Sequence, residues 1–168
     1  MTRKAAGTVL LALLGLLAAL LGAFAAEPLG AVRLLGEASL RADGAHAEFF
    51  GAPDGTTLRA LVAGPLSAER PVVLLHGLGA DATYWAPAVH ALRRAGRTAV
   101  VLDAPGSGRS DTPAARDGLS LPARVAAVEA LGAALRLVRI DLVGHSSTLA
   151  TAGLFALAHP GWVGALVL

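Results

Sequence analysis

The chain has 168 residues, of which 55% are hydrophobic, 15% are charged and none is cysteine. This length suits one domain, and the missing thiol excludes a disulfide scaffold, a cysteine-based zinc site and a cysteine nucleophile. The formal charge of +2 comes from Arg3 and Lys4, because the other 12 basic residues balance 12 acidic residues that all lie at or after Glu27. We expect no nucleic-acid partner, since counterion release requires clustered cations.

Residues 5–26 form an uncharged and strongly apolar stretch directly after Arg3 and Lys4. The pattern predicts either an uncleaved membrane anchor or a signal peptide cleaved after the A-x-A site Ala23-Phe24-Ala25. Its length of 22 residues favours the anchor, because about 20 apolar residues cross the hydrocarbon core. The positive-inside rule then places the following domain on the extracytoplasmic side, either anchored to the membrane or secreted after cleavage.

Residues 27–44 mix Pro28, several glycines and alternating charges without a clear period, which predicts a linker or stalk. An ordered domain is expected over residues 45–168. It opens with two strand-like runs on either side of the sequence Ala-Pro-Asp-Gly at 52–55. A Pro-Asp-Gly turn between such runs predicts a β-hairpin.

Four short and mostly apolar runs follow the hairpin, as is typical of strands buried on both faces of a parallel sheet. They occupy residues 72–75, 99–102, 140–143 and 163–168. Helical periodicity separates them, over residues 84–95, 121–137 and about 147–158. Alternating strands and helices predict an α/β fold, with a mostly parallel sheet covered by helices on both faces.

Three motifs begin where apolar runs end: HGLG at 76–79, DAPGSGRS at 103–110 and GHSST at 144–148. The carboxyl ends of parallel strands border the functional crevice of such a sheet. Ser146 follows a strand and opens a helix, which matches the first half of the G-x-S-x-G nucleophile elbow. A tight turn there would present the serine Oγ above the sheet, beside backbone N–H groups that can stabilise an oxyanion.

These motifs, in this order, resemble the α/β-hydrolase superfamily over residues 45–168, in the branch with an HG-x-x oxyanion loop. The resemblance implies that Ser146 is the nucleophile of a serine hydrolase that cleaves a carboxylic ester, thioester or amide through an acyl-enzyme. It also implies that the backbone N–H groups of Leu78 and Ser147 form the oxyanion hole and that the loop 103–110 is structural. We expect a small acyl compound as substrate, with neither a cofactor nor a metal.

The histidines are expected to have structural roles. His76 precedes a glycine turn and should fix its loop instead of acting as a base. His145 should point down beside the elbow, and His90 should lie on the exposed side of its helix. His159 ends a helix of about a dozen residues, which puts it on the order of 15 Å or more from Ser146.

The acid and the histidine of the triad normally follow the serine in this fold. The 22 residues after Ser146 contain no acidic residue and His159 as the one histidine. The strand at 163–168 also ends the chain without a covering helix. We therefore expect a C-terminally incomplete fold and an inactive 168-residue chain; the alternative is a catalytically inactive hydrolase-like fragment or binding module.

Two further expectations concern the elbow. The family's usual glycine two residues after the nucleophile is Thr148 here. Because threonine is β-branched, close packing of helix against strand is harder, and we expect a slightly displaced elbow. Related dehalogenases and epoxide hydrolases use an aspartate nucleophile, so the serine at 146 disfavours their chemistry.

Overall fold

The computed structural model describes residues 3–67 and 70–168, which belong to two units, Met1–Ala38 and Ser39–Leu168. The first unit contains helix α1 (Arg3–Ala26) and the beginning of helix α2 (Pro28–Ala42). Most of the predicted linker is therefore helical, because leucine, alanine, arginine and glutamate favour a helix strongly enough to outweigh the glycines. Leu40, near the end of α2, is buried in the core of the second unit.

The apolar segment 5–26 lies within α1. Among the residues that the structure describes, no helix has the combination of length and apolar character that crossing a membrane requires. The interpretation of this segment as a membrane anchor, which relied on the length of its apolar stretch, is therefore not supported.

A six-stranded sheet with the order β1-β2-β4-β3-β5-β6 forms the centre of the second unit. Its strands are β1 (Ala45–Gly51), β2 (Thr57–Ala63), β3 (Val72–Leu75), β4 (Ala99–Leu102), β5 (Ile140–Gly144) and β6 (Val163–Val167). The pairs β1–β2 and β2–β4 are antiparallel, whereas β3–β4, β3–β5 and β5–β6 are parallel. The predicted hairpin and the mostly parallel sheet are both confirmed.

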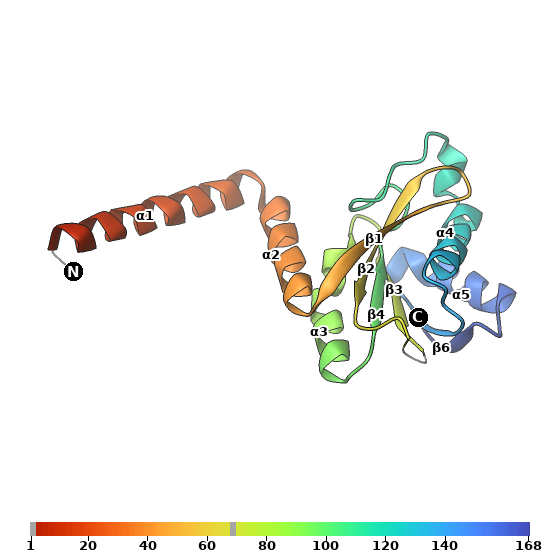
Figure 1. Ribbon diagram of the computed structural model, residues 1–168. Coiled ribbons are helices and arrows are strands. Elements are labelled where there is room, and N and C mark those ends of the chain that lie inside the picture. Colours follow the sequence, from red (N-terminus) through yellow and green to blue (C-terminus); the bar gives the residue numbers. More distant parts are fainter. Residues whose placement is uncertain (1–2, 68–69) are drawn as a thin grey trace. The chain divides into compact units, whose positions relative to one another are not determined.

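Helices cover both faces of this sheet (Figure 1). Helix α3 (Ala86–Arg94) packs on one face, and helices α4 (Leu121–Ala134) and α5 (Leu149–Ala158) pack on the other. Since successive strand residues point to opposite faces, Val73 joins the core cluster under α4 and α5, while Leu74 joins the cluster under α3. Full burial of each such side chain stabilises the fold by about 1.5–3 kcal/mol.

Local signals explain where the helices begin and end. The Oγ of Ser120 accepts a hydrogen bond from the N–H of Ala123 at 3.4 Å, so α4 begins where the sequence predicts. It ends three residues earlier than predicted, and Arg136 has a φ of 53°, outside the helical region. Helix α3 is preceded by a 3₁₀ turn, η1 (Ala82–Trp85), which Asp81 caps through the N–H of Thr83.

Strand β6 differs from the other parallel strands. The sequence predicts a strand buried on both faces, but within the described residues β6 is partly exposed and pairs with β5 alone. The side chains of Leu166 and Val167 are 39% and 56% exposed. An apolar composition shows that a segment can be buried, but it does not show which neighbouring elements will cover it.

Candidate active site

Ser146 lies in the turn between β5 and α5, at the carboxyl end of a central strand. Its φ is 57°, in the left-handed region that residues other than glycine rarely adopt. The residue is exposed, and it begins the short 3₁₀ turn η3 (Ser146–Thr148). A strained turn of this kind raises a serine hydroxyl out of the sheet, as a nucleophile elbow requires.

Two glycines make room for this turn. A Cβ added to Gly144 would lie 2.8 Å from the carbonyl oxygen of Thr148 and 2.9 Å from the Cβ of Ala152, so α5 packs closely on the end of β5. A Cβ added to Gly77 would lie 3.1 Å from the Cβ of Ser146. The HGLG loop and the elbow are therefore in direct contact.

The side chain of Thr148 ties the elbow together. Thr148 is buried, and its Oγ1 accepts a hydrogen bond from the N–H of His145 at 3.0 Å. The same hydroxyl lies 3.0 Å from the carbonyl oxygens of both Leu75 and His145, one of which accepts its hydrogen. From the sequence we expect the β-branched Thr148 to displace the elbow slightly. The structure has the turn at this position, and the Thr148 hydroxyl connects it to the carbonyl oxygen of Leu75 at the end of β3.

Leu78 and Ser147, the two residues whose N–H groups are expected to form the oxyanion hole, line the same cavity of about 150 Å³. Leu78 lies in the exposed turn after β3. Ser147 lies in the first turn of a helical segment, where backbone N–H groups have no acceptor within the helix. The two residues that the sequence resemblance assigns to the oxyanion hole therefore line one cavity, although they come from different loops.

His76 links the HGLG loop to the loop after β4. It is buried, and its Nδ1 lies 2.9 Å from the carbonyl oxygen of Gly77. Its Nε2 accepts a hydrogen bond from the N–H of Ala104 at 3.1 Å. Since a carbonyl oxygen only accepts, Nδ1 carries the hydrogen of a neutral ring. Both ring nitrogens are used, as expected for a histidine that fixes its loop.

The other four histidines also have partners of their own. The ring of His145 is exposed instead of pointing down beside the elbow; it stacks on Tyr84 with a centroid distance of 5.0 Å, and its Nε2 lies 3.3 Å from the Tyr84 Oη. The remaining three contact carboxylates: His46 with Glu48, His90 with Asp43 and His159 with Glu129.

Asp103 is the centre of a buried polar network beneath the loop 103–110. Its side chain has no exposed surface, and its Oδ2 lies 3.1 Å from both Arg59 Nη1 and the backbone nitrogen of Arg109. Its Oδ1 accepts a hydrogen bond from the N–H of Ala82 at 2.7 Å. The carboxylate thus connects its own loop with β2 and with the turn before α3. This agrees with the structural role that the sequence resemblance implies for the loop 103–110.

The sequence did not single out Arg59. It lies in the middle of an otherwise apolar run, TLRALVA, and it is almost fully buried in β2. A charged residue at a position whose neighbours are all buried requires an opposite charge nearby. That interruption is the signal that could have predicted a buried carboxylate partner.

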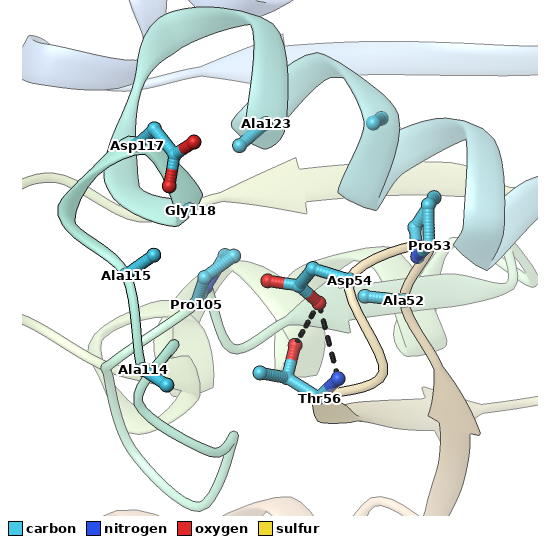
Figure 2. Close-up of a pocket in the computed structure, with 11 residues that line it drawn as sticks. Ala52, Pro53, Asp54, Thr56, Pro105, Ala114, Ala115, Asp117, Gly118 and Ala123 are labelled. Atoms are coloured by element: carbon cyan, nitrogen blue, oxygen red, sulfur yellow. Dashed lines mark hydrogen bonds between the residues drawn. The ribbon is translucent and has the colours of Figure 1, made fainter.

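A larger cavity, of about 300 Å³, lies between the β1–β2 turn and the segment 105–126 (Figure 2). Its walls are mostly alanine and proline, with Asp54 and Asp117 as its carboxylates. The hydroxyl of Thr56, and then its backbone N–H, donate hydrogen bonds to Asp54 and lower the pKa of that carboxyl. Because Asp54 is engaged within its own turn, the smaller cavity beside the elbow is the better candidate site.

Comparison with known proteins agrees with the fold described above. A family model described as alpha/beta hydrolase fold matches residues 70–168. A 2-hydroxy-6-oxononadienedioate/2-hydroxy-6-oxononatrienedioate hydrolase from Burkholderia vietnamiensis is 40% identical over 121 residues, which are 68% of this chain and 41% of that relative. The chain spans about two-fifths of the length of the curated relatives it matches first.

Solved structures show the same likeness. An epoxide hydrolase from an endophytic Streptomyces has a TM-score of 0.65 and 32% identity, and the match covers 73% of this chain and 36% of the other. An esterase from Exiguobacterium antarcticum has a TM-score of 0.66 and 28% identity, with 72% of this chain and 44% of the other covered. This chain therefore corresponds to part of a larger domain, as the sequence predicts.

Proposed function

The chain belongs to the α/β hydrolase fold family, and we propose that it carries the nucleophile of a serine hydrolase that cleaves a carboxylic ester, thioester or amide. The observation that carries the proposal is the backbone of Ser146, held at a φ of 57° at the end of β5. The adjoining cavity, lined by Leu78 and Ser147, supports the same proposal.

In the proposed reaction, the Oγ of Ser146 forms a bond to the carbonyl carbon while its proton passes to a general base. The carbonyl oxygen becomes an oxyanion, which the N–H groups of Leu78 and Ser147 stabilise. Collapse of this intermediate breaks the bond to the alcohol, thiol or amine, which takes the proton from the base. Water then attacks the acyl-enzyme, releases the carboxylic acid and restores the serine.

A serine hydroxyl needs a histidine base oriented by an acid. Within the described residues, no histidine forms a hydrogen bond with Ser146, and each of the five is held by another partner. The proposal therefore assigns the base and the acid to polypeptide outside these 168 residues. The same observation favours the second candidate, a catalytically inactive hydrolase-like fragment or binding module.

The substrate proposed here is a small acyl compound. The Burkholderia relative is named as a hydrolase of small oxo-dioate molecules, which supports a small-molecule substrate for this chain as well. The cavity of about 150 Å³ beside the elbow is also of a size for part of a small molecule and not for a folded partner.

A fluorophosphonate reagent, which labels activated serines, separates the two candidates. We expect labelling of the full natural polypeptide that contains these residues, loss of labelling in Ser146→Ala, and retained labelling in the neighbouring control Ser147→Ala, which keeps its backbone N–H. The 168 residues alone should label slowly or not at all. A folded full polypeptide that does not react would reject the hydrolase proposal and leave the binding module.

A further inference from the structure

Arg124 lines the cavity beside the elbow, and the proposed reaction assigns no role to its charged side chain. It lies in the first turn of α4, is half-buried, and lines the cavity that Leu78 and Ser147 also line. Among the residues that the structure describes, its guanidinium forms neither a hydrogen bond nor an ion pair. A partly desolvated cation in this position favours an anionic ligand.

The rest of the cavity wall does not neutralise this charge. Among its described lining residues there is no carboxylate. His76 also lines the cavity, but its ring is neutral, since Nε2 accepts the N–H of Ala104 and Nδ1 donates to the carbonyl of Gly77. Arg124 is therefore the one charged residue among the described residues that line the cavity.

A second polar group lies next to Arg124 without a partner. Thr151, in α5, is 2% exposed, and its Oγ1 makes no hydrogen bond within the described structure. Thr151 and Arg124 line a small cavity of about 10 Å³, which shares His76 and Thr148 with the larger one. Such a space is about the size that one ordered water needs.

From these contacts we infer that Arg124 binds a carboxylate of the substrate, and that Thr151 holds a water which extends this site. The substrate class is then an acyl compound with a free carboxylate in addition to the bond that Ser146 attacks. The planar guanidinium suits this group because it donates two parallel hydrogen bonds to one carboxylate. The inference rests on the proposed function for the identity of the cavity, but the binding it predicts requires no reaction.

The test uses the 168-residue chain with Ser146→Ala, so that no turnover can occur. Backbone amide resonances are followed by NMR during titration with monomethyl glutarate, which carries one carboxylate, and with dimethyl glutarate, which carries none. We expect the monoester to bind about tenfold or more tightly than the diester, as a charge-assisted pair implies, and to shift the amides of Leu78, Ser147 and Ala104.

Variants identify the side chains responsible. Arg124→Gln, which preserves helix propensity, should weaken binding of the monoester about tenfold or more and leave the diester unchanged. Arg124→Lys should give an intermediate result, since lysine keeps the charge and loses the planar fork. Thr151→Val should weaken the monoester by a smaller factor. The matched control is Arg94→Gln, an exposed arginine on α3, and it should change neither affinity.

Equal binding of the two esters would overturn the inference, as would an unchanged monoester affinity in Arg124→Gln or no binding of the monoester up to its solubility. If Arg124→Gln does not fold, the comparison of the two esters on Arg124→Lys decides the same question. Failure of the serine to react with a fluorophosphonate would count against the proposed function alone, because the carboxylate site is measured without the Ser146 hydroxyl.

Discussion

Gly77 lies so close to Ser146 that a Cβ on the glycine would stand 3.1 Å from the Cβ of the serine. The same added atom would stand 3.2 Å from Nδ1 of His145. The contact brings the turn that carries Leu78 against the turn that carries the candidate nucleophile. The distance between the hydroxyl of Ser146 and the backbone N–H of Leu78, the proposed oxyanion donor, therefore depends on the absence of a side chain at position 77.

Gly77→Ala should lower the free energy of unfolding by about 1–3 kcal/mol, because the added methyl group forces the elbow to move by a few tenths of an ångström. Urea unfolding measures the change. The control is Gly153→Ala in α5, where a Cβ would meet nothing within 4 Å and alanine favours the helix by about 1 kcal/mol. Equal effects of the two substitutions would contradict the close contact.

Asp103→Asn should destabilise the fold by about 3–5 kcal/mol, because it leaves the buried guanidinium of Arg59 without its counter-charge. The double variant Arg59→Met with Asp103→Asn should lose less than the sum of the two single variants. Denaturant unfolding of all three gives the coupling energy.

An ion pair whose arginine is more exposed, and whose carboxylate keeps a second arginine partner in Arg97, provides the control for this cycle. Arg70 is 40% exposed and lies 3.7 Å from Asp141, so Arg70→Met should cost no more than about 1 kcal/mol. Additive losses in the Arg59–Asp103 cycle would show that the two side chains do not depend on one another.

Thr148→Val should destabilise the protein by about 1–3 kcal/mol, because it keeps the shape of the side chain and removes the hydroxyl that binds the N–H of His145 and the carbonyl of Leu75. Thr148→Ser keeps the hydroxyl and should retain most of this stability. Thermal unfolding compares the two variants. A valine variant as stable as the serine variant would mean that the hydroxyl does not hold the elbow.

Thr56→Val should raise the pKa of Asp54 toward its ordinary value, because the Thr56 hydroxyl is the largest cause of its lowered pKa. A carboxyl whose pKa is lowered by folding stabilises the folded state above its ordinary pKa of about 4. That contribution is lost as the pH falls through the lowered pKa.

An NMR titration of the Asp54 carboxyl carbon measures this shift directly. Thr57→Val is the control, because the hydrogen bonds to Asp54 come from Thr56 and not from its neighbour. An unchanged titration of Asp54 in Thr56→Val would show that the hydroxyl is not what lowers the pKa.

Export of the domain stays a prediction from the sequence. Arg3 and Lys4 precede the uncharged stretch 5–26, as in a signal peptide. A phosphatase reporter that is active only outside the cytoplasm, fused after the domain, should be active in bacteria, and deletion of residues 1–26 should abolish that activity. N-terminal sequencing of the product should find Ala26 first if cleavage follows the A-x-A site at residues 23–25. Activity of the deleted form would reject export.

Sequence patterns were sufficient wherever a structural feature depends on neighbouring residues. Strands β3 and β4 have the predicted limits, because a short apolar run bounded by proline or polar residues is typical of a strand buried on both faces. The start of α4 follows from the hydroxyl of Ser120 as a cap. The turn at 144–148 follows from the small residue at Gly144, where a Cβ would strike α5.

The sequence by itself therefore determined the class of fold, the order of its elements and the position of the elbow, since these arise from local periodicity, caps and turns. Only the tertiary structure decided that Arg59 meets Asp103 across 44 residues of chain and that Arg124 lines the same cavity as Leu78 and Ser147. Such relationships depend on how distant segments pack. A periodic pattern states that a residue will be buried or exposed, but the identity of its neighbour emerges only when the sheet and its helices are assembled.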